Sequence, residues 1–198
     1  MERIRISAAT IVRIELNGKL LLGLNKKRRL AGRNVYTPFG GGLEFHESAR
    51  PFLESLEAVF VSGNDLRLMI SEDKLPVFEK WFNQRQHREL SPYRELLEEL
   101  VDEEKVLPEL PENEITLEYL LSKAERAITD RPGQEGSLTQ RYYEVYKAKF
   151  SSAYEQMIRL ALVKSDTHLA LVTEQEILAG ESASGVKIGS NCIPLIHK

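Results

Sequence analysis

Apolar residues recur at every second position in the first part of the chain. They are Ile4, Ile6, Ala8, Val12, Ile14 and Leu16, and a period of two is typical of a strand with one buried face. Asn17-Gly18 supplies the positive φ angles of a tight turn, and the apolar segment 20–24 follows it. This pattern predicts a β-hairpin at the start of the chain.

Spacings of three and four residues predict helices further along. One helix is expected behind Ser48, on the apolar residues Phe52, Leu53, Leu56, Val59 and Phe60, and a second on Leu75, Phe78, Trp81 and Phe82. A third begins at Ser91-Pro92, since serine can cap a helix and proline fits its first turn, and it continues to about Lys105.

The remaining sequence alternates strand and helix patterns. Segments 115–128 and 142–150 flank a turn-rich stretch, RPGQEGSLTQ, and predict a second hairpin, whereas 152–162 fits a helix or a strand equally. A short strand, HLALVT, then leads into a helix with a capping box of Thr173 and Glu176 that ends at Gly180. We therefore expect one α/β domain over residues 1–198.

Composition narrows the classes of function. The formal charge of −3 and a pI near 5.9 give no overall positive field for bulk nucleic acid or an anionic membrane. Cys192 is the only cysteine, which excludes an internal disulfide and a cysteine-based zinc site. No apolar run approaches the roughly 20 residues that span a bilayer, and the first residues do not resemble a signal peptide. A cytoplasmic protein is expected.

The segment 91–104, SPYRELLEELVDEE, carries the most distinctive chemistry. Glu95, Glu98 and Glu99 stand at i, i+3 and i+4, so their carboxylates share one face of the predicted helix. The opposite, apolar face can anchor the helix, which leaves the acidic face open to solvent. A hard cation such as Mg²⁺ would turn the repulsion of these carboxylates into coordination, although a solvated acidic face is the commoner explanation of such a run.

A glycine loop, GGGLEFHE, adds weight to a metal site. Gly40, Gly41 and Gly42 permit close approach of the backbone to a ligand, and Glu44 and Glu47 add carboxylates. The basic stretch 25–29 with Arg33 precedes this loop and could meet phosphates, but a solvated surface is the more common role of such a cluster. None of His46, His87, His168 and His197 has metal-ligand spacing, and no histidine is assigned a catalytic role.

Together these pieces resemble the Nudix box, G-x5-E-x7-R-E-U-x-E-E-x-G-U, where U is a bulky aliphatic residue. Gly41 and Glu47 match its first half, and 94–99 matches R-E-U-x-E-E. The chain departs from the pattern twice: 48–93 places 46 residues where the pattern has seven, and Val101 and Asp102 replace the final glycine and aliphatic residue. The first departure predicts a helical insertion over 48–93 within the box.

The resemblance implies a Nudix-type α/β/α sandwich with a mixed sheet, and a set of site residues. The metal ligands would be Gly41, through its carbonyl, Glu47, Glu95, Glu98 and Glu99. Glu95 would otherwise serve as the base for water, with Arg94 orienting it, and Gly40, Gly41 and Gly42 would contact substrate. The cofactor would be Mg²⁺, with Mn²⁺ as a substitute.

The reaction so implied is hydrolysis of a diphosphate bond in a nucleoside-diphosphate-linked small molecule. Two alternatives remain open: a Nudix-like sensor that binds a nucleotide without turnover, and an interaction module whose insertion engages a partner, including a second copy of the chain. The aromatic residues of the insertion fit a lid, a dimer interface or a small local core equally well. Nudix domains with long insertions also resemble those that accompany bacterial nucleotide second-messenger defence systems.

Overall fold

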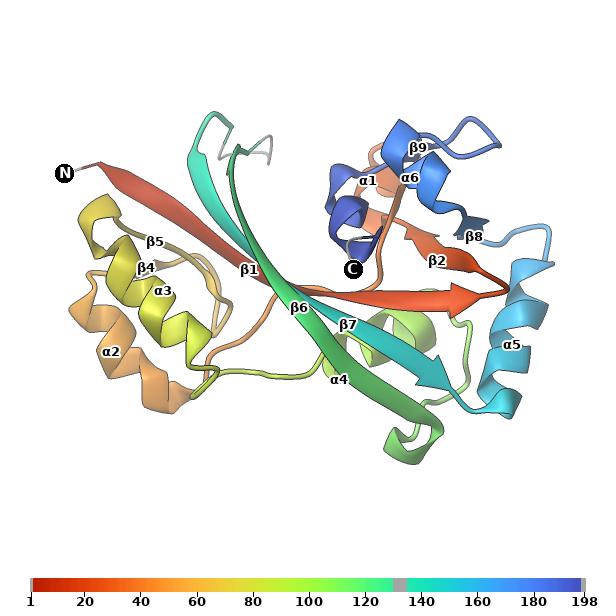
Figure 1. Ribbon diagram of the computed structural model, residues 1–198, viewed down its shortest axis with the longest axis horizontal. Coiled ribbons are helices and arrows are strands. Elements are labelled where there is room, and N and C mark those ends of the chain that lie inside the picture. Colours follow the sequence, from red (N-terminus) through yellow and green to blue (C-terminus); the bar gives the residue numbers. More distant parts are fainter. Residues whose placement is uncertain (1, 130–134, 197–198) are drawn as a thin grey trace. The chain divides into compact units, whose positions relative to one another are not determined.

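The computed structural model describes residues 2–129 and 135–196. These residues form two compact units, shown with the labels of their helices and strands in Figure 1. The first unit consists of the residues up to Thr10, Gly41–Ser91 and Ser122–Glu144. The second consists of Ile11–Gly40, Pro92–Leu121 and the chain from Val145 onward. Each unit has its own apolar core, and each is described separately below.

Three long strands contribute residues to both units. They are β1 (Arg3–Leu16), β6 (Ile115–Ile128) and β7 (Leu138–Phe150). β6 pairs with β7, which confirms the second predicted hairpin, and β7 also pairs with β1. Part of the predicted turn between β6 and β7, residues 130–134, lies outside the described residues, as does His197.

The first unit is built on a small antiparallel sheet. β5 (Arg67–Ser71) pairs with β1, with Ile4 opposite Ile70, and β4 (Val59–Phe60) pairs with β5. Helices α2 (Arg50–Ser55) and α3 (Leu75–Asn83) pack against these strands (Figure 1). Each helix follows a single 3-10 turn, η1 (Glu47–Ala49) before α2 and η2 (Glu72–Lys74) before α3. Phe78, Trp81 and Phe82 are buried in this core, so a local core is the correct interpretation of the insertion's aromatic residues.

The sequence pattern was wrong about one helix of this unit. The helix expected through Phe60 ends at Ser55, because Glu57 adopts a left-handed φ of 56° and the chain then turns into β4. Strands β4 and β5 were not expected, since Val59 and Phe60 were assigned to a helix and residues 67–71 to no element. The predicted insertion therefore contains a two-stranded element as well as its helices.

A buried ion pair ties two distant segments of the first unit together. Arg88 and Glu144 both have fully buried side chains, and the Arg88 guanidinium nitrogen lies 2.6 Å from the Glu144 carboxylate. Arg88 also donates to the Phe82 carbonyl at 3.0 Å and lies 4.1 Å above the Phe82 ring. Buried charges persist only where they are paired and hydrogen-bonded, so this pair fixes the end of α3 against β7.

The second unit has β2 (Lys19–Leu24) as its central strand. β2 pairs antiparallel with β1, β8 (Leu169–Val172) and β3 (Val35–Thr37), and β3 pairs parallel with β9 (Lys187–Ile188). The β1–β2 connection confirms the first predicted hairpin, with Asn17 and Gly18 at φ angles of 53° and 72°. The sheet is thus mixed, and the α/β class is as predicted.

The helices of the second unit are short. They are α1 (Lys26–Leu30), α4 (Tyr93–Leu97), the π-helical segment η3 (Glu98–Glu103), the 3-10 turns η4 (Glu112–Glu114) and η5 (Ser190–Ile196), α5 (Ser152–Leu162) and α6 (Glu174–Ala179). The capping box of Thr173 and Glu176 is present, and Gly180 ends α6 in the left-handed conformation. No helix of the described residues has the length and apolarity needed to cross a membrane.

Candidate metal and diphosphate site

The acidic helix is held in the second unit by its leucines. Leu96 and Leu100 are fully buried and pack with Val12, Ile14 and Phe39 in the apolar core of that unit. The helix begins at Tyr93, with Pro92 at its N-cap position. It therefore starts one residue later than the sequence pattern predicts.

The second half of this helix is wound more loosely than an α-helix. From Glu98 to Glu103 it is π-helical, and the Glu104 N–H donates to the Glu99 carbonyl at 3.0 Å. The chain then turns at Lys105, whose φ is 50°, and the N–H of Val106 returns to the Leu100 carbonyl at 2.8 Å. Lys105, in the left-handed conformation, thus ends the helix. It lies four residues beyond Val101, the position at which the Nudix pattern has its glycine. π-Helical turns inside α-helices occur frequently at functional sites.

The three carboxylates of the pattern differ in their surroundings. Glu98 is 53% exposed, whereas Glu95 is only 14% exposed, and both contact the Arg94 guanidinium, at 3.1 and 2.8 Å. The Glu99 carboxylate accepts a hydrogen bond of 2.7 Å from the Gly40 N–H. The expectation that the acidic face stands open to solvent is therefore wrong for Glu95 and Glu99.

Glu99 has the most perturbed carboxyl of the candidate site. Burial raises the pKa of this group to about 8, the hydrogen bond from Gly40 opposes the rise, and the negative charges of Glu95, Glu103 and Glu104 add to it. A carboxyl with this pKa is mostly protonated at neutral pH and becomes charged readily only when a positive charge arrives.

The glycine loop is divided between the two units. Gly40, in the second unit, has a φ of 119°, a conformation that favours glycine, and from there its N–H reaches Glu99. Gly41, in the first unit, accepts from the Thr10 N–H at 2.9 Å through its carbonyl. A side chain at Gly42 would displace the Asp65 carboxylate, because a Cβ there would lie 2.6 Å from one of its oxygens.

Glu47, the remaining predicted ligand, belongs to the first unit. Its two carboxylate oxygens accept from Arg50 at 2.7 and 2.9 Å, a bidentate pair that lowers the pKa of the Glu47 carboxyl. Arg50 in turn lies about 5 Å from the ring centres of Phe45 and Phe60 and donates to Asn64. In the structure described, the partner of Glu47 is thus an arginine.

The donor types fit a hard cation. Glu95, Glu98 and Glu99 offer only oxygen atoms on one short helical segment, and the pKa of Glu99 is raised by burial and, to a smaller extent, by the negative charges near it. Their oxygens are not yet gathered around one point, because no three acidic, histidine or cysteine side chains of the described residues form a group able to hold a metal. Arg94 lies between Glu95 and Glu98 and would have to give way.

Sequence reasoning missed a second set of charged residues at the end of this helix. Lys26 and Arg29 of α1 lie 3.0 and 3.6 Å from Glu103 and Glu104, and His168 lies 2.6 Å from Glu104. Lys26 and Arg29, from the basic stretch interpreted as solvated surface, are therefore paired with the acidic helix. No local pattern could reveal these contacts, since they join segments more than 60 residues apart.

One family of known proteins matches almost the whole chain. The profile of the family described as "SMODS-associated NUDIX domain" matches residues 3–196. Among solved structures, the chain is similar to the solution structure of the E. coli ORF135 protein, at 13% identity over 97% of this chain and 86% of that chain, with a TM-score of 0.38. No curated protein matches the chain.

Proposed function

Because the chain belongs to the family of SMODS-associated NUDIX domains, we propose that it is a Mg²⁺-dependent hydrolase of a diphosphate bond in a nucleoside-diphosphate-linked small molecule. The observation that carries this proposal is the Glu99 carboxyl, buried beside Gly40 and near the acidic side chains of Glu95, Glu103 and Glu104, with its pKa raised to about 8. A purely structural carboxylate in such a position would be expected to have a cationic partner.

Glu98 and Glu99 would hold the metal, with Glu95 as a further ligand or as the base for water. When bound, Mg²⁺ would offset the charge of the diphosphate and lower the pKa of a coordinated water. The exposed Glu98 is accessible from solvent, whereas Glu99 must lose its proton for its carboxylate to bind a cation.

Arg94 would determine the ionisation and the orientation of the Glu95 carboxylate. It now contacts both Glu95 and Glu98, and when Glu98 turns toward a metal, Arg94 would remain with Glu95 alone. A guanidinium beside Glu95 would keep that carboxylate ionised and fixed in orientation, as a base for water requires. Gly40, in the same unit as these acids, would let the backbone approach the substrate.

A nucleotide sensor without turnover is the second candidate. It is favoured by one observation, the placement of Arg94 between Glu95 and Glu98, because a guanidinium in a metal site can replace the cation and leave a site that binds but does not cleave. Ligand binding without product would identify this function.

Turnover by the full-length protein tests the proposal. A panel of nucleoside diphosphates linked to sugars, nucleosides and phosphate would be incubated with Mg²⁺, and the products followed by ³¹P NMR. We expect cleavage of at least one compound, and a loss of about 100-fold or more in the double variant Glu98→Gln, Glu99→Gln, since these groups supply the metal.

The matched control is Asp102→Asn, which removes an exposed charge from the same helix and should cleave like the native protein. Circular dichroism would establish that all variants are folded. Equal turnover by the native protein and the double variant would contradict the proposed site. Binding of a panel member without cleavage would favour the sensor.

A further inference from the structure

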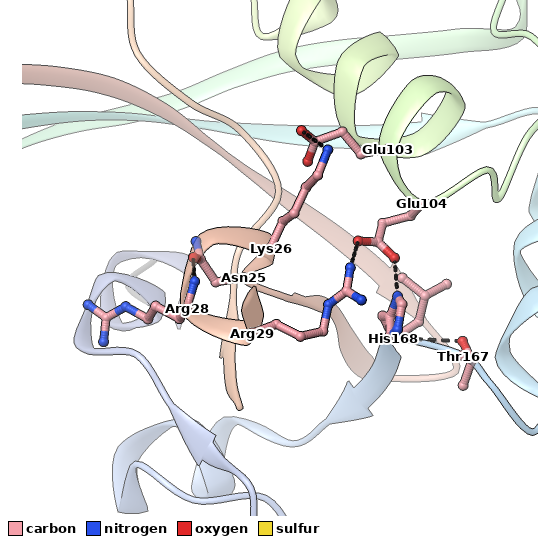
Figure 2. Close-up of polar contacts among 9 residues, drawn as sticks. Asn25, Lys26, Arg28, Arg29, Glu103, Glu104, Thr167 and His168 are labelled. Atoms are coloured by element: carbon pink, nitrogen blue, oxygen red, sulfur yellow. Dashed lines mark hydrogen bonds and ion pairs between the residues drawn. The ribbon is translucent and has the colours of Figure 1, made fainter. Parts of the chain in front are cut away.

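Glu104 lies at the end of the π-helical segment and is almost buried. Its side chain is 9% exposed, and its two oxygens have different partners: Oε2 lies 2.6 Å from His168 Nδ1 and Oε1 lies 3.6 Å from the Arg29 guanidinium. Figure 2 shows the Glu104 carboxylate between these two side chains. A carboxylate that is removed from water and contacted on both oxygens has little freedom to move.

The two partners of Glu104 are themselves fixed at the end of β2. The Leu24 N–H donates to the His168 carbonyl at 2.8 Å, and the Arg29 N–H donates to the Asn25 carbonyl at 2.9 Å. The Asn25 side chain caps α1 through the Arg28 N–H at 3.0 Å. Arg29, on α1, and His168, directly before β8, therefore contact Glu104 from segments that are themselves fixed by backbone hydrogen bonds.

Glu104 is coupled directly to the candidate metal ligand. Its N–H donates to the Glu99 carbonyl at 3.0 Å, the hydrogen bond that closes the π-turn. The Glu99 side chain then reaches the Gly40 N–H at 2.7 Å. A continuous chain of contacts thus runs from His168 and Arg29 through Glu104 to the carboxylate of Glu99 and the glycine loop.

We propose that Glu104, held by His168 and Arg29, is a positioning residue that keeps the π-turn closed and so aims the Glu99 carboxylate at Gly40. This inference rests on the proposed function, because the orientation of the Glu99 carboxylate matters for metal binding. The negative charge of Glu104 adds to the repulsion on Glu99, so any help that Glu104 gives to the site comes through the geometry of the π-turn and not through its charge.

Glu103 provides a control on the same helical turn. It carries the same charge, also raises the pKa of Glu99 and also pairs with α1, through Lys26 at 3.0 Å (Figure 2). Its side chain is well exposed, however, and it does not make the hydrogen bond that closes the turn on Glu99. Variants at 103 and 104 therefore remove the same charge, and only those at 104 also remove the side-chain anchor of the residue whose N–H closes the π-turn.

Two readouts test the inference on the full-length protein. Mn²⁺ binding is measured by electron paramagnetic resonance, and hydrogen exchange of the Gly40 amide is measured in the metal-free protein by NMR. Glu104→Gln, Glu104→Ala and His168→Ala should weaken Mn²⁺ binding by about 10- to 100-fold, as loss of a group that orients a metal ligand does, and should speed exchange at Gly40. Glu103→Gln and Glu103→Ala should change either quantity by less than about threefold, as expected for an exposed pair.

The outcomes separate this inference from the proposed function. Equal effects of the Glu103 and Glu104 variants on both readouts would overturn the positioning role, and Glu104→Gln preserves the test if the alanine variant does not fold. Absence of Mn²⁺ binding by the native protein would overturn the proposed function. In that case, faster exchange at Gly40 in the Glu104 variants alone would still support the positioning of Glu99.

Discussion

At the scale of single residues, Glu99 determines what the candidate site can do. A helical wheel placed it on the acidic face with Glu95 and Glu98, and the structure adds that this carboxyl is buried and bound by a backbone amide. Burial separates its behaviour from that of Glu98, which stays exposed on the same turn. The difference in surroundings gives the three acids different roles.

The raised pKa of Glu99 predicts how metal-free stability depends on pH. The folded protein holds this proton up to about pH 8, whereas the unfolded chain loses it near pH 4.5. Between about pH 4.5 and about pH 8, Glu99 is ionised in the unfolded chain but not in the folded protein, so the rising pH increasingly favours the unfolded state, with no further change above about pH 8. Glu99→Gln lacks this penalty, so its melting temperature relative to the native protein should rise between pH 5 and pH 8.

Thermal unfolding in metal-free buffer at several pH values measures this difference. The control is Glu98→Gln, which removes an exposed carboxyl from the same helix. A difference between Glu99→Gln and native protein that stays constant with pH would show that Glu99 ionises like an ordinary surface glutamate.

At the scale of elements, the sequence predicted those that have a strong local pattern and missed those that depend on tertiary contacts. The hairpin of β1 and β2 was predictable because a period of two and an Asn-Gly turn act together, and α6 because its capping box is local. α1 was missed, since it has no buried residue and depends on the Asn25 cap and on ion pairs with η3. The candidate acids were identified from their spacing, but Gly40, the partner of Glu99, lies far away in the sequence, as does His168, the partner of Glu104.

The buried pair of Arg88 and Glu144 yields a prediction for the first unit. Glu144→Gln keeps the shape of the side chain but leaves the Arg88 charge buried and uncompensated. We expect a loss of roughly 3–5 kcal/mol in the free energy of unfolding, measured by urea denaturation. Glu125→Gln is the control, because it breaks a more exposed pair with Arg141, on the neighbouring strand. Equal stability of the two variants would contradict a structural role for the buried pair.

At the scale of the whole molecule, two apolar cores share continuous strands. β1, β6 and β7 each contribute residues to both units, so unfolding of one unit frees strand residues that belong to the other. We predict a single unfolding transition that includes both units. Leu53→Ala in the first core and Ile158→Ala in the second should each cost about 2–5 kcal/mol, and each should shift the whole transition.

Calorimetry of these two variants, with a comparison of the calorimetric and van't Hoff enthalpies, tests the shared transition. Leu178→Ala, which truncates an exposed leucine, is the control and should be nearly neutral. Two resolved transitions, only one of which moves in each variant, would show that the units unfold independently.

The central claim is that the acidic helix is a metal centre with Glu99 as a ligand, and titration of the metal-free protein with Mg²⁺ at pH 7 tests it most directly. Calorimetry in buffers of different ionisation enthalpy counts the protons released on binding. Because the pKa of Glu99 lies near 8, the account predicts that Mg²⁺ binds with release of nearly one proton, and that Glu99→Gln loses both the affinity and the proton. Binding of equal strength by the native protein and Glu99→Gln, with no proton released by either, would contradict it.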